Sequence, residues 1–289
     1  MKRYIKFIVL GLQKKIIQEE KIKIKIRGDK MRFYVSQLVE TEKILPILRK
    51  YDVGLEVVQF ANPYILDNRY EIMEIYKKEL KDLYGNIDLI IHGPYADLCP
   101  ASRDSEIKRI TKLRMDQAYE VANDLGAKKI LYHNGYTPRT YTYLEWKKNA
   151  YDFWIEFLKG KNNKEIVIEN VLDEEYELLD DLMTRTNKDN FSVCIDIGHI
   201  NAYSKISVEE WINALSYKLS HIHLHNNYKD KDSHYGIYKG SMNVIRILNK
   251  LNDINNNITV SLEITDLEQL KESLDILVRE DFVKLKIQK

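Results

Sequence analysis

The chain has only two cysteines and no long hydrophobic run. Cys99 and Cys194 lie in different predicted elements, so they form neither a disulfide framework nor a zinc-knuckle spacing, and this fits a reducing cytoplasm. We expect Cys194 to pack in a hydrophobic core. No apolar run approaches the roughly 20 residues that a transmembrane helix needs, so the sequence argues against a membrane protein.

The chain also lacks an excess of charge of either sign, because 45 Lys and Arg residues nearly balance 44 Asp and Glu residues. This balance hides an asymmetry. Residues 1–30 contain ten Lys and Arg against three Asp and Glu, a net charge of +7, which leaves −6 on residues 31–289. An acidic main body weakens a nucleic-acid-binding interpretation, because Lys and Arg side chains supply most of the affinity for phosphates.

Residues 1–30 differ in pattern from the rest of the chain. The short apolar run FIVLGL follows a basic start, as in a signal peptide, but it is short and continues into Lys14 and Lys15 without a small-residue cleavage site. We interpret this segment as an accessory hairpin, a poorly ordered tail or an extension before a start at Met31. The predicted organisation is a basic N-terminal extension at 1–30 and one domain at 31–289.

From Met31 onward, β-rich runs alternate with helix-length segments. The predicted strands are MRFYVS, GLEVVQF, IDLIIH, KKILYH, EIVIEN, FSVCID, LSHIHLH and ITVSLEI. The predicted helices lie near residues 41–51, 69–83, 104–125, 143–158, 174–185, 208–215, 244–251 and 267–277. Strands separated by helices form right-handed β-α-β units with a parallel sheet. Eight such units within about 250 residues predict the α/β class and a single closed (β/α)8 TIM barrel. Few helices carry a clear start signal such as Ser207 followed by Glu210.

Four of the seven histidines lie within residues 221–234, HIHLHNNYKDKDSH. In a strand, His221, His223 and His225 share one face, while the apolar residues between them share the other. Asp232 and His234 follow on the predicted loop. Imidazole and carboxylate together suit a divalent metal, in particular zinc or manganese. A polar strand with solvated histidines is the alternative for this stretch taken alone.

Metal-capable side chains also recur at the ends of the predicted strands. In chain order, the third to eighth strands end with His92, His133, Glu169, Asp196, His223 and Glu263. The carboxyl ends of barrel strands form the face where barrel enzymes place their chemistry. A single His or Glu at a strand end is usually solvated or hydrogen-bonded, but six in succession are hard to obtain by accident. Carboxylates buried so close together would repel strongly, so the pattern predicts a bound cation.

Two short motifs lie at the predicted mouth. In CIDIGH, Asp196 and His199 are three residues apart at a predicted strand-to-loop turn, where Gly198 would let the backbone bend so that both point to the rim. Gly93 and Pro94 follow His92 and predict a turn that carries Tyr95 onto the same face. Tyr95 would there either pack or contact a substrate.

At these residues the chain resembles the xylose isomerase-like TIM barrel superfamily, which contains sugar isomerases and epimerases as well as endonuclease IV-type abasic-site nucleases (AP endonuclease family 2). The resemblance covers about Met31 to Leu277. It is carried by GLE at 54–56, HGPY at 92–95, His133, IEN at 168–170, CIDIGH at 194–199, HLHNN at 223–227, DSH at 232–234, and Leu262 with Glu263.

In the isomerase and epimerase branch, the resemblance implies one divalent metal ion, Zn2+ or Mn2+. The matching ligands are Glu169, Asp196, His223 and Glu263. The ion would chelate the carbonyl and adjacent hydroxyl of a ketose and stabilise a metal-bound enediolate. Glu169 and Glu263 would be the catalytic base and acid on opposite sides of the sugar, and His199 would be a catalytic residue that orients it.

The same branch implies a small-molecule sugar or sugar phosphate as the partner. Tyr95, Glu56 and His225 are the expected substrate-binding residues, with Glu56 near the barrel mouth. Arg103 or Lys239 would be candidates to bind a phosphate group. Relatives of this kind often pair, so a homodimer is a further expectation.

The nuclease branch implies three zinc ions and DNA as the partner, and residues that match all nine of its ligands are present. The three sets are His92, His133 and Glu169; Glu169, Asp196, His223 and Glu263; and His199, Asp232 and His234. A metal-activated hydroxide would attack the phosphate 5′ to an abasic sugar, and Tyr95 would line the DNA groove.

Three departures favour the sugar enzyme over the nuclease. His225 and Asn226 stand where the nuclease pattern has Asn and Asp, and Asn134 with Gly135 replaces a Pro-Gly pair. The loops expected to enter DNA show no Arg-rich or basic-and-aromatic interleaving, as in NPYILDNRY, and the barrel is acidic. A protein that binds metal or sugar without turnover is a third interpretation.

Overall fold

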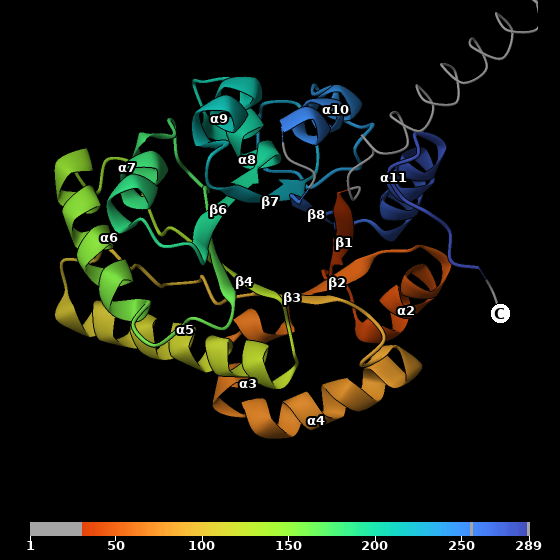
Figure 1. The fold of residues 1–289 in the computed structure, drawn as a ribbon, viewed down its shortest axis with the longest axis horizontal. Helices are drawn as coiled ribbons and strands as arrows, with labels where there is room; N and C mark the ends of the chain where they lie inside the picture. Colours follow the sequence, from red (N-terminus) through yellow and green to blue (C-terminus); the bar gives the residue numbers. More distant parts are fainter. Residues whose placement is uncertain (1–30, 255–256, 288–289) are drawn as a thin grey trace, which may run out of the picture.

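The computed structural model describes residues 31–254 and 257–287, so the predicted extension at 1–30 lies outside the described residues. The strands are β1 (Arg32–Ser36), β2 (Gly54–Val57), β3 (Leu89–His92), β4 (Lys129–His133), β5 (Glu165–Glu169), β6 (Phe191–Asp196), β7 (Leu219–Leu224) and β8 (Thr259–Leu262). Each strand runs parallel to the next, and β8 pairs with β1 to close the sheet (Figure 1). The predicted eight-stranded TIM barrel is confirmed.

Helices connect successive strands and surround the barrel (Figure 1). The main helices are α2 (Thr41–Lys50), α4 (Arg69–Leu80), α5 (Ser105–Asp124), α6 (Tyr143–Phe157), α7 (Glu177–Thr186), α9 (Val208–Leu215), α10 (Val244–Ile254) and α11 (Leu267–Arg279). These match the predicted helices to within about three residues at each end. The structure adds the short elements η1 (Gln59–Ala61), α3 (Pro63–Asp67), η2 (Lys81–Leu83) and α8 (Ile197–Tyr203).

Helix α8 corrects the prediction of a strand-to-loop turn after Asp196. The side chain of Asp196 caps this helix, because its Oδ1 accepts a hydrogen bond of 2.7 Å from the backbone N–H of His199. Gly198 therefore lies within a helix rather than at a bend. A Cβ atom at this position would lie only 1.9 Å from Cε1 of His225, so Gly198 makes room for that imidazole.

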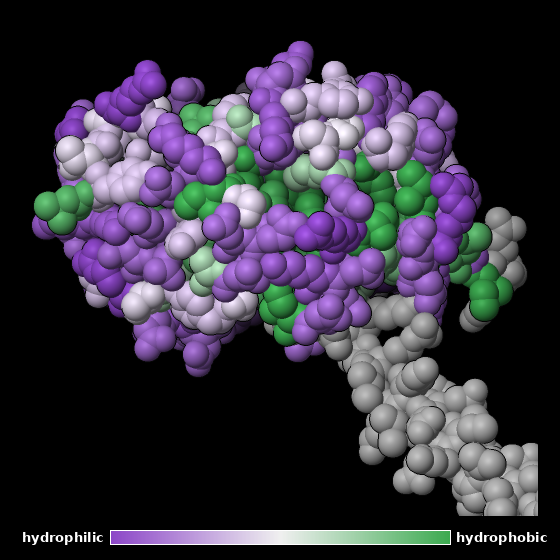
Figure 2. All heavy atoms as spheres, turned by 90° about the horizontal axis from the view of Figure 1, so that it is seen from above, coloured by the Kyte–Doolittle hydropathy of each residue, from purple (hydrophilic) through white to green (hydrophobic). Residues whose placement is uncertain are grey.

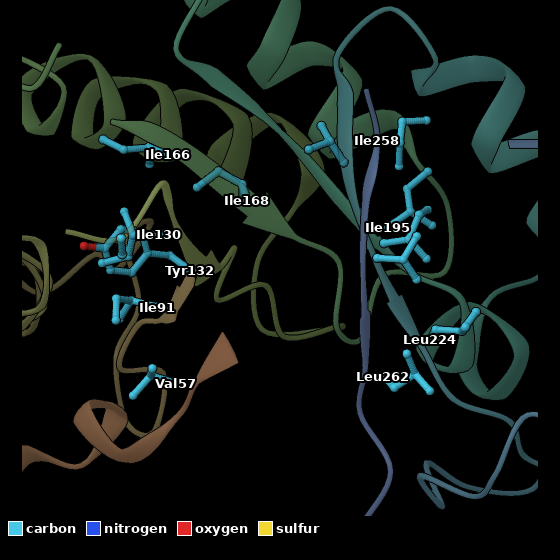
Figure 3. Close-up of a cluster of buried hydrophobic side chains, with 14 of the residues drawn as sticks. Val57, Ile91, Ile130, Tyr132, Ile166, Ile168, Ile195, Leu224, Ile258 and Leu262 are labelled. Atoms are coloured by element: carbon cyan, nitrogen blue, oxygen red, sulfur yellow. The ribbon is translucent and has the colours of Figure 1, made fainter. Parts of the chain in front are cut away.

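Alternate residues along each strand face opposite sides of the barrel wall. The outward-facing residues join the large hydrophobic core beneath the helices, as Ile91, Ile130 and Ile168 do (Figure 3). The inward-facing residues next to them form a second, smaller hydrophobic cluster: Tyr34, Ile90, Leu131, Val167 and Cys194. The expected burial of Cys194 in a core is confirmed. The same alternation turns the polar residues at the strand ends inward.

Opposite ends of the barrel carry different chemistry. At the amino-terminal end, Lys129 Nζ lies 3.0 Å from Glu165 Oε2 and donates to the backbone carbonyl of Ser220 at 2.8 Å. The face shown in Figure 2 is mainly hydrophilic, with hydrophobic side chains visible across its middle. Within residues 31–254 and 257–287, no helix is both long and apolar enough to cross a membrane.

Asp173 braces two loops at the carboxyl end of the barrel. Both of its carboxylate oxygens accept hydrogen bonds of 2.8 Å from the side-chain amide of Asn134, and one also accepts from the Val171 N–H at 3.0 Å. Asn134 directly follows β4, and Asp173 follows β5. Burial raises the pKa of Asp173 to about 6, although the hydrogen bonds from Val171 and Asn134 oppose this rise.

The capping box predicted at Ser207 is present at the start of α9, where Ser207 Oγ and Glu210 reciprocally bond the backbone. We expect Ser207→Ala to lower the free energy of unfolding by about 1 kcal/mol, because a helix N–H loses its partner. Chemical denaturation measures this change. Ser216→Ala at the other end of α9 is the control and should have a smaller effect; equal losses for the two variants would contradict the capping role.

The raised pKa of Asp173 predicts a pH-dependent stability. The folded protein holds this proton more tightly than the unfolded chain, so the contribution of Asp173 is present near pH 4 and is lost as pH rises through about 6. Asp173→Asn cannot ionise, so its unfolding free energy relative to the wild type should rise by roughly 3 kcal/mol between pH 4 and pH 7. Denaturation of the metal-free proteins across this range measures the difference. The exposed control Asp230→Asn should run parallel to the wild type, and a parallel Asp173→Asn profile would refute the assignment.

Candidate metal centre

Four of the predicted residues converge at the carboxyl end of the barrel and form what we call the inner cluster: Glu169, Asp196, His223 and Glu263. Nδ1 of His223 lies 3.2 Å from Glu169 Oε1, 3.4 Å from Glu263 Oε2 and 3.8 Å from Asp196 Oδ2. One potential ligand atom from each of the four residues lies within 4.8 Å of the others. The inner cluster is therefore compact enough for one cation to reach all four side chains.

A second group shares Glu169 with the inner cluster. His92 Nε2 and His133 Nε2 each lie 3.6 Å from Glu169 Oε2. The rings of His92 and His133 meet edge to face with their centroids 5.1 Å apart. Glu169 thus lies between the imidazoles of His92 and His133, from β3 and β4, and the imidazole of His223, from β7.

A third group, which we call the outer cluster, contains His199, His225, Asp232 and His234. Asp232 Oδ2 lies 2.9 Å from His234 Nε2 and 3.3 Å from His199 Nε2. His225 Nε2 lies 3.1 Å from Asp196 Oδ1 and 3.5 Å from Asp232 Oδ1, so this ring links the outer cluster to the inner one. His225 is completely buried and stacks on His234 at 4.0 Å between ring centroids.

Several atoms of these clusters are buried without a hydrogen-bond partner in the described part of the chain. They are both carboxylate oxygens of Glu169, Nδ1 of His223, Nδ1 of His225 and Oδ1 of Asp232. Burying an unpaired charge is costly, and buried carboxylates are normally paired or bound to metal. Oxygen and nitrogen donors of this kind suit Zn2+ or Mn2+. The residues present therefore fit a divalent cation.

The two glutamates of the inner cluster have opposite pKa shifts. Burial alone would raise the pKa of Glu169, but the imidazoles of His223 and His133 outweigh burial and hold that pKa well below its usual range. Burial raises the pKa of Glu263, the neighbouring Glu169 and Glu56 carboxylates add to the rise, and His223 opposes it. The two carboxyl groups are therefore not equivalent.

The histidines respond to the same balance. Burial favours neutral imidazoles. At His223 this effect is outweighed by nearby acidic groups, Cys194 and Glu169, which raise its pKa well above the usual value. At His199 the carboxylate of Asp196 likewise raises the pKa well above the usual value. Burial dominates at His133 and lowers its pKa to about 3. At His234, burial is outweighed by Asp232, which raises the pKa to about 9. The clusters thus favour positive charge close to their carboxylates.

Backbone carbonyls orient three of the imidazoles. Nδ1 of His92 lies 2.9 Å from the Gly93 carbonyl, and Nδ1 of His199 lies 2.9 Å from the Asn170 carbonyl. Nδ1 of His234 likewise lies 2.9 Å from the Glu263 carbonyl. A carbonyl oxygen only accepts, so Nδ1 donates its proton there, and Nε2 is the nitrogen that faces the neighbouring carboxylates.

Glu56 was expected near the mouth in contact with substrate, but it is completely buried. Its Oε1 lies 3.1 Å from His223 Nε2, while Oε2 lies 3.4 Å from His221 Nε2 and accepts a hydrogen bond from Ser261 Oγ. The sequence analysis placed His221 on the same strand face as His223 but gave it no specific role, and it did not consider Ser261. The period of two along each strand could have indicated that both face the interior, but it could not show that they meet Glu56.

Asn170 also supports the site without having been assigned a role from the sequence. Its side-chain Oδ1 accepts from the Asp196 N–H at 2.9 Å, and its Nδ2 donates to the Asp196 carbonyl at 3.2 Å. This pair of bonds fixes the end of β6 against the end of β5. The IEN motif thus supplies both a member of the inner cluster, Glu169, and a brace for Asp196.

A cavity of about 340 Å³ opens beside His133. Its lining includes Tyr95, Tyr136 and Tyr141, and Tyr95 is 45% exposed and stacks on His133 at 4.6 Å. The two cations considered for phosphate binding do not line this cavity themselves. Arg103 pairs with Glu145, and Lys239 Nζ lies 4.4 Å from the centroid of the Tyr235 ring. A larger cavity of about 970 Å³ lies between α2 and the end of α4 and touches no residue of the three clusters.

Comparison with known proteins identifies relatives along most of the chain. An uncharacterised protein of Methanocaldococcus jannaschii is 27% identical over 217 residues, which cover 70% of this chain and 72% of that protein. A solved D-tagatose 3-epimerase-like protein shares 24% identity with a TM-score of 0.70, over 87% of this chain and 97% of its own. A Thermus thermophilus protein, in a structure from ZnCl2 soaking, shares 20% identity with a TM-score of 0.69, over 86% and 97% of the two chains.

These structural likenesses agree with the barrel described above. The sequence profile for the family described as Xylose isomerase-like TIM barrel matches residues 50–280. The match begins just before β2 and ends just after α11, so it spans seven of the eight strands. It includes the inner cluster, the outer cluster and the group of His92, His133 and Glu169. This chain belongs to the xylose isomerase-like TIM barrel family.

Proposed function

We propose that this chain is a divalent-metal-dependent sugar isomerase or epimerase whose metal is held by Glu169, Asp196, His223 and Glu263. The observation that carries the proposal is the meeting of these four side chains around buried atoms of Glu169 and His223 that have no hydrogen-bond partner among the described residues. Membership of the xylose isomerase-like family and likeness to an epimerase-like structure support the same activity.

A divalent ion in the inner cluster would act as a Lewis acid toward the carbonyl and adjacent hydroxyl oxygens of a ketose. Such an ion would make the carbon-bound proton next to the carbonyl acidic enough for a carboxylate to remove. Glu169 is the last residue of β5 and Glu263 directly follows β8, so the two carboxylates approach His223 from different strands. One carboxylate would remove that proton and the other would return a proton to the substrate, while His199 would orient the sugar.

The substrate would enter beside His133, through the cavity lined by Tyr95, Tyr136 and Tyr141. Aromatic rings at such a site can pack against the C–H face of a sugar, while nearby hydroxyls and amides bind its polar groups. Among the described residues that line this cavity there is no Lys or Arg. Arg103 borders the cavity, because it donates to the Thr140 carbonyl at 3.2 Å and lies 4.9 Å from the centroid of the Tyr141 ring, and it is the cation that a sugar phosphate would meet there.

A second candidate function, an abasic-site endonuclease with three zinc ions, is favoured by one specific observation. The nine residues that match the nuclease ligands lie in three compact groups: His92, His133 and Glu169; the inner cluster; and the outer cluster. His225 distinguishes the outer cluster from the nuclease pattern, because this buried imidazole lies against Asp196 and Asp232. Metal content and substrate tests separate the two functions.

The sugar-enzyme proposal predicts about one tightly bound Zn2+ or Mn2+ per chain after dialysis. Glu169→Gln should lose this ion, because the substitution removes the charge from the carboxylate whose two oxygens have no other hydrogen-bond partner in the described chain. Elemental analysis of the purified proteins measures the content. Three zinc ions per chain would instead support the nuclease.

The proposal also predicts exchange of a carbon-bound ketose proton with solvent, detectable as deuterium incorporation in D2O. Glu263→Gln should reduce the exchange rate by about 10²–10⁴-fold, the usual range for loss of a general acid or base. Glu268→Gln is the matched control, since that side chain on α11 is 82% exposed. Failure to exchange any ketose, together with cleavage of abasic-site DNA that Glu169→Gln abolishes, would overturn the proposal in favour of the nuclease.

A further inference from the structure

Glu56 is a buried carboxylate on β2 that contacts His223 of the inner cluster from inside the barrel. Its two oxygens are occupied inside the barrel, because Oε1 lies 3.1 Å from His223 Nε2 and Oε2 accepts from Ser261 Oγ. None of its surface is exposed, and it does not line the cavity beside His133. One oxygen of Glu56 also lies within 4.8 Å of a potential ligand atom of His92, His223 and Glu263, but both oxygens already have partners, so we take His223 as its route to the inner cluster.

His223 is the neighbour that joins Glu56 to the inner cluster. One ring nitrogen, Nε2, faces Glu56, and the other, Nδ1, faces Glu169, Asp196 and Glu263. Nδ1 has no hydrogen-bond partner among the described residues. The orientation of this ring thus decides which nitrogen the inner cluster receives.

We propose that Glu56 is a positioning residue that accepts the Nε2–H of His223 and so presents the Nδ1 lone pair to a metal ion in the inner cluster. A carboxylate acceptor fixes the tautomer and raises the basicity of the nitrogen on the far side of the ring. The proposal rests on the metal site of the proposed function, but it does not depend on which substrate that site turns over.

The other imidazoles show why the carboxylate matters. His92, His199 and His234 each have one nitrogen against a neutral backbone carbonyl and the other toward a carboxylate. His223 has the reverse ring orientation, with Nδ1 rather than Nε2 toward the cluster, and a carboxylate in place of the carbonyl. Three carboxylates surround the unpartnered Nδ1 of His223, so this nitrogen would be the one neutral ligand among the four side chains of the inner cluster.

Glu56 is itself held by a buried hydrogen-bonded group on β7 and β8. His221 Nε2 lies 3.0 Å from Ser261 Oγ, and His221 Nδ1 lies 2.6 Å from Thr259 Oγ1. The strand register places His221 beside Thr259 and His223 beside Ser261. These contacts leave Glu56 with little freedom to rotate away from His223, which is what a positioning residue requires.

The test compares Glu56→Gln with Glu165→Gln, which makes the same chemical change at an ion pair with Lys129 at the amino-terminal end of the barrel. Zinc affinity is measured by competition with a chromophoric chelator, and the inner site is defined as the binding that Glu169→Gln removes. We expect Glu56→Gln to raise the zinc dissociation constant about 10–100-fold and Glu165→Gln to leave it within about twofold of the wild type. Unfolding of the metal-free variants shows whether lost affinity merely follows lost stability.

A second measurement holds even if Glu56→Gln fails to fold. Two-bond ¹H–¹⁵N spectra of zinc-loaded wild-type protein, with His223 assigned by comparison with His223→Gln, should show a proton on Nε2 and zinc on Nδ1. A proton on Nδ1, or wild-type zinc affinity in Glu56→Gln, would overturn the positioning role. Proton exchange of a ketose by the wild-type protein, measured in parallel, separates the two proposals. If the wild type binds zinc but exchanges no ketose proton, only the proposed function is refuted. If the wild type is active and Glu56→Gln keeps wild-type zinc affinity, only the role of Glu56 is refuted.

Discussion

Charge balance at the carboxyl end of the barrel is the constraint on which the site depends. Glu169, Asp196 and Glu263 surround one nitrogen of His223, and all four side chains are buried. At such distances carboxylates repel one another strongly in a medium of low polarity, unless protons or a cation lie between them. The shifted pKa values of Glu169 and His223 reflect this need in the metal-free protein. A divalent ion would meet it and displace protons on binding.

The barrel creates this arrangement through two simple regularities. Parallel closure brings the carboxyl ends of all eight strands to one rim, and the period of two sends alternate side chains inward. Below the rim, the inward positions on four neighbouring strands are Ile90, Leu131, Val167 and Cys194. On β2, β7 and β8 they are polar, where Glu56 contacts His221 and Ser261. The interior is thus apolar on one side and hydrogen-bonded on the side that supports His223.

Much of this architecture could be predicted from the sequence, because the strands are short apolar runs with polar residues at their ends. The barrel and most helix ranges were confirmed, and the predicted residues at the strand ends do lie together. Helix α8 could not be foreseen from CIDIGH, since its start depends on Asp196 capping the His199 N–H. The reason for Gly198 was also hidden, because the ring that needs its space, His225, is distant in sequence. The burial of Glu56 likewise depends on partners from β7 and β8, and local spacing does not report such contacts.

The central claim, that these side chains share one cation, is tested most directly by anomalous diffraction from crystals grown with Mn2+ or Zn2+. The account predicts an anomalous peak between Glu169, Asp196, His223 and Glu263, at about 2.0–2.2 Å from a ligand atom of each, as usual for zinc with nitrogen and oxygen ligands. The absence of a peak there at saturating metal, or carboxyl groups that point away from one another into solvent, would contradict it.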